Sequence, residues 1–463
     1  FENGEKAERA RIEVERVPSF GDRPVLILGA GPAGLFAALR LAERGIPCRL
    51  LEQGSETGKR VLAIAKFWRS GTLDPRNNVG FGEGGAGLFS DGKLITRIKS
   101  PHIPYVMQRL VQFGAPPEIE FQANPHVGSD RIRRVIPKLR EHFKALGGQI
   151  QFDAKVTEIL TRDRQIEGVK LESGEVIRGD RLILACGHSA EDLFLHLRDL
   201  GVHLEGKSFA VGLRIEHPQD AINKLQWRQH HAHPKLGAAN SKLAYTNPKD
   251  GIGIYSFRMC PGGYVLSCAT GPGGIVSNGM SNYSRGSRFA NSAVVVSLDH
   301  ATHFGEDLFG GMKYRADLEK RALDQVISAG GSKELPAQRL MDFIEERSGP
   351  VGESSSPSGV ISTRLDKLFD GNFKKHFIEG LKQFDVGMHG FISNEALLHG
   401  VESRTSCPLR ITRDPGTFQS LSHRGLYPAG EGAGYAGGIT SAACDGVRIA
   451  DPIANEVTVS LRT

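Results

Sequence analysis

The chain has 463 residues, of which 39% are hydrophobic and 24% are charged, and its formal net charge is +6. These values are typical of a globular protein with two or three domains or lobes, and no apolar run approaches the roughly 18 residues that span a bilayer. The Lys and Arg residues are dispersed rather than clustered, which favours a mixed surface and disfavours nucleic acid as a partner.

Cysteine and histidine spacing predicts no metal site. The six cysteines form no Cys-x-x-Cys pair, which argues against a zinc ribbon and for a reducing compartment. We therefore expect the bacterial cytoplasm or, alternatively, a plastid stroma. The cluster His230-His231-Ala232-His233 lacks a nearby carboxylate, so we predict no metal there either. Residues 1–22 are polar and are expected to form an N-terminal extension.

The first regular elements surround a glycine-rich turn. An apolar strand over residues 25–28 enters Gly29-Ala30-Gly31-Pro32-Ala33-Gly34, helical spacing continues to Gly45, and a strand over residues 48–51 ends at Glu52. A strand, a Gly-x-Gly-x-x-Gly turn, a helix and a later acid predict a dinucleotide site. A carboxylate at Glu52 can bond both hydroxyls of an adenosine ribose, which disfavours NADP and leaves NAD and FAD open.

The most glycine-dense stretch covers residues 80–94. Residues 82–87 repeat the glycine pattern, but no apolar strand precedes them and Ser90-Asp91-Gly92 breaks any following helix. We predict a loop whose bare backbone lies against a planar cofactor, with contacts from Gly84, Gly85, Ala86 and Gly87. The alternative is a flexible surface loop, although such loops seldom use six glycines without solvating side chains.

Residues 129–187 are expected to complete the first part of a nucleotide-binding domain. A helix over residues 129–146 is followed by three antiparallel strands at 149–160, 166–171 and 176–177. An apolar strand then ends in Ala185-Cys186-Gly187, and we expect it to return to the parallel sheet.

Residues 201–385 differ from the preceding segment in their pattern of expected secondary structure. Strand-like runs at 209–216, 263–268 and 293–296 alternate with turns, and two helical stretches lie near 316–328 and 363–382. We interpret this segment as an inserted, mostly antiparallel domain of class α+β that covers the cofactor and contacts the substrate. Residues 23–200 and 386–463 would then form one discontinuous nucleotide-binding domain of the Rossmann-like α/β class.

The last segment returns to nucleotide chemistry. A short strand leads to Gly430 and Glu431, residues 432–437 repeat the glycine pattern, and a helix can follow over residues 438–457. No second strand with a ribose-binding acid follows. We therefore expect one cofactor to be held by both parts of the discontinuous domain.

Together these segments resemble the glutathione-reductase-type superfamily of FAD-binding oxidoreductases. More narrowly, Phe89-Ser90-Asp91-Gly92-Lys93-Leu94, Met259-Cys260-Pro261-Gly262-Gly263, Glu402-Ser403-Arg404-Thr405-Ser406 and the segment 429–440 resemble a family of FAD-dependent dehydrogenases found in bacteria and plastid-bearing eukaryotes. The resemblance covers nearly the whole chain and implies a non-covalently bound FAD.

The resemblance also implies roles for individual residues. Gly29, Gly31, Gly34 and Glu52 would hold the ADP moiety, helped by the neighbouring Ala30, Pro32, Ala33 and Gln53, while Val156 would meet the adenine and Gly187 the pyrophosphate. Glu431, after Gly430, would bond the ribityl hydroxyls, and Gly437, Gly438, Ile439 and Thr440 would begin a helix facing the pyrimidine end of the flavin.

Three side chains are candidates for chemistry. Lys93 can neutralise a reduced flavin or bind an anionic substrate, Cys260 can present a reactive thiol, and Arg404 can clamp a carboxylate or phosphate. For Lys93 the alternative is a surface lysine, and for Cys260 it is a buried, inert cysteine.

The sequence therefore predicts an FAD-dependent dehydrogenase acting on an unidentified small molecule, with NAD(P)H as a transient donor at most. One alternative is a flavoprotein whose FAD is structural or redox-sensing and which acts as a partner- or RNA-associated factor, as in tRNA modification. A saturating reductase acting on lipid-like substrates is a third class.

Overall fold

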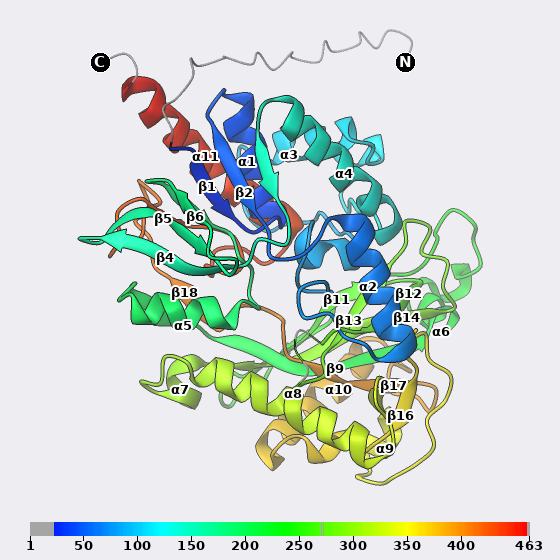
Figure 1. Ribbon diagram of the computed structural model, residues 1–463. Coiled ribbons are helices and arrows are strands. Elements are labelled where there is room, and N and C mark those ends of the chain that lie inside the picture. The colour runs from blue at the N-terminus through cyan, green and yellow to red at the C-terminus, as the bar shows by residue number, and fades with distance from the viewer. Residues whose placement is uncertain (1–22, 270, 272, 461–463) are drawn as a thin grey trace, which may run out of the picture.

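The computed structural model describes residues 23–269, 271 and 273–460, and the expected N-terminal extension 1–22 lies outside them. Two large sheets organise the described chain, a parallel sheet of five strands and a mixed sheet of seven (Figure 1). Among the described residues, no helix combines the length and apolar character needed to cross a membrane.

The parallel sheet has the order β19-β7-β1-β2-β3, with bounds β19 (Leu426–Pro428), β7 (Leu182–Leu184), β1 (Val25–Leu28), β2 (Cys48–Leu51) and β3 (Gln149–Gln151). Its central strands are apolar throughout because both faces of the sheet are covered. The strands predicted around the first glycine-rich turn, before Gly187 and before Gly430 are confirmed.

Four helices cover one face of this sheet: α1 (Pro32–Glu43), α3 (Ile103–Gln112), α4 (Ser129–Ala145) and α11 (Ile439–Ser460). α1 and α11 lie side by side although they are distant in sequence (Figure 1). Gly446 makes this close approach possible, because a Cβ at this position would lie 2.1 Å from the carbonyl oxygen of Ala33.

The other face carries a three-stranded antiparallel sheet and α5 (Glu191–Asp199). The strands are β4 (Val156–Arg162), β5 (Gln165–Leu171) and β6 (Val176–Arg178), and their buried side chains share a core with Leu26 and Leu182 of the parallel sheet. The predicted class, a parallel sheet with an antiparallel crossover, is therefore confirmed.

The mixed sheet has the order β10-β11-β14-β9-β17-β15-β16, and all its pairs are antiparallel except β15 with β16. The bounds are β10 (Ala244–Thr246), β11 (Gly253–Cys260), β14 (Phe289–Leu298), β9 (Phe209–Pro218), β17 (Leu397–Glu402), β15 (Leu335–Arg339) and β16 (Val360–Ser362). Helices α8 (Gly310–Ser328) and α10 (Gly371–Gly387) pack on one face through apolar residues such as Leu318 and Phe377.

A two-stranded ribbon, β12 (Gly263–Ser267) with β13 (Ser277–Ser281), joins the two sheets. Leu266 and Val276 belong to the core beside the parallel sheet, whereas Val265 packs into the core of the mixed sheet. The indole of Trp68, on α2 (Thr57–Ser70), donates a hydrogen bond to the carbonyl of Ser267 at 2.9 Å. The ribbon therefore fixes how the two regions meet.

Two sequence expectations need correction in detail. The strand expected over residues 149–160 is two strands, because Asp153 adopts a positive φ of 54° and redirects the chain from β3 in the parallel sheet to β4 in the crossover. β17 lies beyond residue 385 but pairs with β9 and β15, so we extend the proposed inserted region to about residue 405.

Short elements complete the fold: α6 (Gln219–Trp227), α7 (His300–Phe304), α9 (Leu340–Ile344), β8 (Leu204–Gly206) and β18 (Leu409–Ile411).

Candidate functional site

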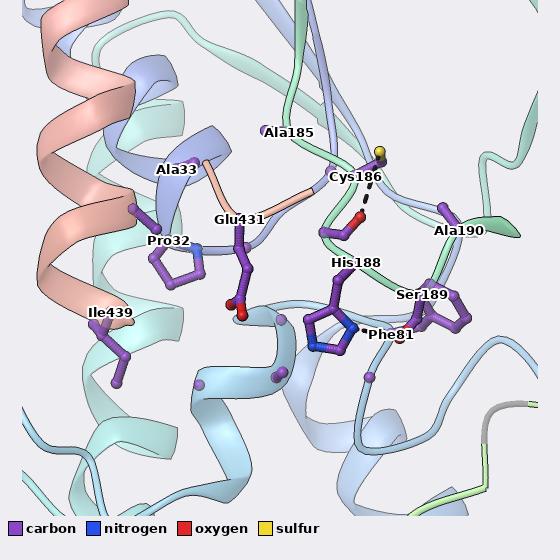
Figure 2. Close-up of a pocket in the computed structure, with 18 of the residues that line it drawn as sticks. Pro32, Ala33, Phe81, Ala185, Cys186, His188, Ser189, Ala190, Glu431 and Ile439 are labelled. Carbon is purple, nitrogen blue, oxygen red and sulfur yellow. Dashed lines mark hydrogen bonds between the residues drawn. The ribbon is translucent and has the colours of Figure 1, made fainter. Parts of the chain in front are cut away.

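One cavity is lined by both regions of the molecule. The first glycine-rich turn, the glycine-dense segment, the turn after β7 and the start of α11 contribute to it, as do Met259 and Cys260 of β11 and Asn278 and Gly279 of β13. Figure 2 shows Pro32, Ala33 and Ile439 on one side and His188 and Ser189 on the other, with the Glu431 side chain extending between them.

The first turn delivers the N-terminus of α1 to the cavity. Gly29 has a φ of 104° and lies against the carbonyl of Ala185, and a Cβ on Gly34 would lie 1.9 Å from the carbonyl of Gly29. α1 begins at Pro32 without a side-chain cap, so its first N–H groups have no partner within the helix. This end can therefore bind an anionic group.

Glu52 ties three segments together at the adjoining edge. Its carboxylate accepts backbone hydrogen bonds from Ala30 at 2.8 Å, from Gly54 at 2.9 Å and from Gly82 at 3.2 Å. Because a carboxylate has about four acceptor positions, at least one remains for a ligand hydroxyl. Glu52 thus positions the glycine-dense segment as well as lining the cavity.

Arg60 holds the glycine-dense segment from behind. Its side chain is fully buried and donates hydrogen bonds to carbonyl oxygens of Asn78, Val79, Gly82, Glu83 and Gly85 at 2.7–3.3 Å. Since these partners are neutral, burial lowers the pKa of Arg60 to about 9. These bonds hold the backbone of the segment in place, and residues 85–89 within it form a short 3₁₀ helix. Both observations disagree with the alternative of a flexible loop.

The late turn places a second acid in the cavity. Burial raises the pKa of Glu431, and its nearest charged partner is Arg258, whose Nη2 lies 3.4 Å from Oε1. The start of α11 is anchored beside it, because the Thr440 hydroxyl donates to the carbonyl of Leu94 at 2.8 Å. The end of the glycine-dense segment and the start of α11 are therefore bonded to each other beside Glu431, although they are distant in sequence.

The turn after β7 adds a histidine that faces the cavity (Figure 2). Nδ1 of His188 lies 3.0 Å from the hydroxyl of Ser189. Burial, together with the nearby guanidinium groups of Arg315, Arg258 and Arg404, holds the pKa of His188 well below its usual range. The imidazole is therefore neutral near pH 7 and can serve as a hydrogen-bond donor or acceptor.

A bulge in β11 provides the opposite wall. The pairing of β11 with β14 shifts register between Phe257 and Cys260, and Arg258 has a positive φ of 49°. Bulges redirect side chains at the edges of sites, and here Arg258, Met259 and Cys260 all line the cavity.

The three candidates for chemistry have different surroundings. Lys93 lines the cavity, and so does Cys260, but burial raises the pKa of the Cys260 thiol to about 11 and disfavours a reactive thiolate. Arg404 does not line the cavity, because its guanidinium donates to Glu319 at 2.8 and 3.0 Å. We therefore remove Arg404 from the proposed site.

Comparisons with known proteins identify the family. Residues 22–176 match the model described as "FAD binding domain", and residues 208–405 match "FAD-dependent protein, C-terminal domain-like". An uncharacterised protein of Clostridium beijerinckii is 40% identical over 456 residues, which cover 98% of this chain and 84% of that protein. This chain belongs to a family of FAD-dependent proteins.

Solved structures that match this FAD-dependent protein are distant. CtdE in complex with FAD is 13% identical, with 95% of this chain and 88% of that chain covered and a TM-score of 0.39. The halogenase PltM is 12% identical, with 96% and 70% covered and a TM-score of 0.44. A flavoprotein/dehydrogenase from Cytophaga hutchinsonii is 13% identical, with 94% and 79% covered and a TM-score of 0.40. At these values the likenesses carry no argument about the reaction.

The cavity residues fit FAD. A Cβ added to Gly187 or Gly437 would meet no atom within 4 Å, so both positions face open space. The uncapped start of α1 suits a pyrophosphate, and the carboxylates of Glu52 and Glu431 are acceptors for sugar and ribityl hydroxyls. FAD is the cofactor of this protein, and these residues are the ones we propose to hold it.

Most residues predicted to contact the cofactor line the cavity. They are Gly29, Gly31, Pro32, Ala33, Glu52, Gln53, Gly85, Ala86, Gly87, Val156, Gly187, Glu431, Gly437, Gly438 and Ile439. Ala30, Gly34, Gly84, Gly430 and Thr440 belong to the same turns but do not line it. Gly34 and Thr440 instead support the turns through the contacts described above, so we assign them a positioning role.

Sequence reasoning missed several lining residues. His188, Ser189, Asp91, Arg258 and Asn278 line the cavity but were not predicted to do so. His188 directly follows the predicted turn at Gly187, so its position offered a usable signal. Arg258 and Asn278 reach the cavity through a bulge and a ribbon, which leave no local pattern.

Proposed function

We propose that this FAD-dependent protein is a dehydrogenase that exchanges electrons between a small organic substrate and non-covalently bound FAD. The observation that supports the proposal is the single cavity shared by the nucleotide-binding turns and by strands β11 and β13. A substrate held by those strands would contact the cofactor directly. FAD, when bound, supplies the site that accepts or donates two electrons.

The residues of the chain have separable roles in this proposal. The start of α1 and Glu52 bind the ADP part, and Glu431 binds the ribityl part and is oriented by Arg258. The start of α11 directs its positive end toward the cavity and stabilises negative charge there. Neutral His188 can hold or pass a proton between the cavity and the hydroxyl of Ser189.

Anaerobic spectroscopy tests the proposal. We expect purified protein, reconstituted with FAD, to show a flavin spectrum that bleaches without oxygen when a member of a panel of alcohols, amines, hydroxy acids and amino acids is added. NADH, NADPH and dithionite are titrated in parallel. Bleaching by dithionite alone would favour a structural or redox-sensing FAD, and bleaching by a nicotinamide would favour a reductase.

Assays with labelled oxygen and with halide distinguish a dehydrogenase from a flavin-dependent monooxygenase or halogenase. A dehydrogenase yields a product with no atom from ¹⁸O₂ and no halogen, whatever the halide concentration. Incorporation of either atom into the product would replace the proposal with a monooxygenase or a halogenase. Absence of bound FAD after reconstitution would overturn the cofactor assignment itself.

A further inference from the structure

Most of the charged side chains that line the cavity form ion pairs, and Glu52 and Lys93 are the two that bond only to neutral groups among the described residues. The pairs are Glu431 with Arg258 at 3.4 Å, Asp91 with Arg285 at 2.6 Å and Asp192 with Lys155 at 2.7 Å, while Glu52 accepts the three backbone bonds described above. Buried charges are stable when they are paired or well hydrogen-bonded. The remaining charge belongs to Lys93, which forms no ion pair among the described residues.

Lys93 is bonded but not neutralised. Its Nζ donates to the carbonyl of Met259 at 2.5 Å and to the side-chain oxygen of Asn240 at 3.2 Å, both neutral acceptors. A lysine ammonium has three donors, so one remains. Burial lowers the pKa of Lys93. The carboxylate of Asp91 is near enough to act on Lys93 but is already bonded to Arg285 at 2.6 Å, and the nearby thiol of Cys260 is neutral, so neither supplies a free counter-charge.

A second polar group lines the same cavity. Asn278 lines the cavity, and its side-chain amide forms no hydrogen bond with any other described residue. Asn278 lies on β13, which packs against β11, the strand whose Met259 carbonyl accepts a hydrogen bond from Lys93. An amide N–H and an ammonium together suit the two oxygens of a carboxylate. One uncompensated positive charge also matches a carboxylate better than a phosphate ester, which carries up to two negative charges.

A negative charge that pairs with Lys93 could come from the substrate or from the cofactor. The position of Lys93 and its neighbours favours the substrate. Met259, Asn240 and Asn278 belong to the inserted region and not to the turns that we propose to bind FAD. Ile95 lines the same cavity and is 47% exposed, so this part of the cavity reaches solvent.

We infer that Lys93 and Asn278 form a subsite for a carboxylate group of the substrate. The inference rests on the proposed function, because it names the class of molecule that the dehydrogenase takes. It adds that this molecule is an organic acid whose carboxylate is anchored at the wall formed by β11 and β13.

Binding of simple acids to the FAD-loaded protein tests the subsite. Isothermal titration calorimetry would compare benzoate and cinnamate with their neutral amides, benzamide and cinnamamide. We expect the acids to bind about tenfold or more tightly than the amides, and this preference to be lost in Lys93→Met. Lys93→Arg should retain part of it, and Asn278→Ala should weaken the acids severalfold.

Lys313→Met is the matched control. It removes the same charge from an exposed lysine that does not line the cavity, and it should leave binding of the acids unchanged. Equal affinity of the wild-type protein for acids and amides, or no binding of either acid, would overturn the subsite without requiring any variant to fold. Equal affinity of the acids for Lys93→Met and the wild type would do the same.

The midpoint potential of bound FAD separates the two sources of negative charge. If Lys93 serves the reduced cofactor, Lys93→Met lowers the potential while affinity for the acids stays as in the wild type, and the subsite is wrong. A loss of affinity for the acids with an unchanged potential supports the subsite. Failure of the protein to bind FAD at all would be seen first, and it would count against the proposed function instead.

Discussion

Two sets of buried polar groups, one in each region of the molecule, are held in different ways. In the nucleotide-binding region, Glu52 and Arg60 bond to backbone N–H and carbonyl groups of glycine-rich turns. In the inserted region, the buried side chains of Arg214 and Glu402 instead bond to each other, at 2.9 Å. The first arrangement shapes a backbone surface, and the second fixes strands within a sheet.

This difference has a consequence for mutation. Loss of the Arg214 side chain should cost folding energy, because it leaves the Glu402 carboxylate buried without its partner charge. A change at Arg60 should chiefly deform the wall of the cavity, because its partners are backbone groups of one segment. The variants below test this separation in order of decreasing effect.

Arg214→Met should have the largest effect on stability. Arg214 is fully buried and donates to Glu402 and to the side-chain oxygen of Asn291, so the variant leaves a buried carboxylate unpaired. We expect a loss of about 3–5 kcal/mol in the free energy of unfolding, measured with denaturant. The double variant Arg214→Met/Glu402→Leu should recover much of this loss, and a double variant no more stable than the single one would contradict the explanation.

Arg60→Met should destabilise less but weaken FAD binding more. The loss of hydrogen bonds to five carbonyl groups should cost about 2–4 kcal/mol, partly offset because a buried charge is no longer present. We expect the dissociation constant of FAD, followed by flavin fluorescence, to rise at least tenfold.

Arg76→Met controls for loss of an arginine in the same segment. Arg76 pairs with Glu172, and their side chains are 40% and 50% exposed, so we expect Arg76→Met to lower the free energy of unfolding by at most about 1 kcal/mol and to leave the FAD affinity unchanged. If Arg60→Met kept wild-type affinity for FAD, the assigned role of Arg60 in shaping the cavity would be wrong.

Glu431→Gln should change the pH dependence of FAD binding. The ionised carboxylate is the better acceptor for ribityl hydroxyls, and burial raises the pKa of Glu431 above the usual 4.5. In the wild type, affinity for FAD should therefore be full above this raised pKa and fall as pH decreases through it. The glutamine variant should bind about tenfold more weakly at neutral pH and lack that decrease. Parallel pH profiles would argue against contact between Glu431 and FAD.

Gly58→Ala should have the smallest effect. Gly58 lies in the first turn of α2, and a Cβ there would meet no atom within 4 Å. We expect a gain of about 0.5 kcal/mol in unfolding free energy, because alanine favours the helix and restricts the unfolded chain. Gly147→Ala is the matched comparison: its space is equally open but its φ is 91°, so it should destabilise by about 1 kcal/mol.

The sequence predicted features that depend on neighbouring residues. The turn at residues 29–34, the apolar strand before it and the helix after it have local patterns, and the structure contains all three. The antiparallel crossover was predicted for the same reason, although one strand was extended too far past Asp153.

Contacts between particular side chains or strands that are distant in sequence were mostly not predictable. Nothing near Arg404 in the sequence indicates Glu319, 85 positions away, as its partner. The sequence therefore predicted a substrate-binding role for an arginine that pairs with another side chain of the protein. Arg60 likewise has no local pattern that relates it to Gly85. β17 was placed outside the inserted region because its strand partners lie far from it in sequence.

The pairing of α1 with α11 has a consequence for biosynthesis. The turns at Gly29 and Gly437 line the same cavity but are separated by about 400 residues. At about 5–20 residues per second, a ribosome needs roughly 20–80 s to make the chain between them. The growing chain therefore carries an incomplete cofactor site for most of its synthesis, and the cavity is complete only after α11 has emerged and packed onto α1. A nascent chain interrupted before β19 lacks Glu431 and the start of α11, so we expect it to hold FAD more weakly than the finished chain does.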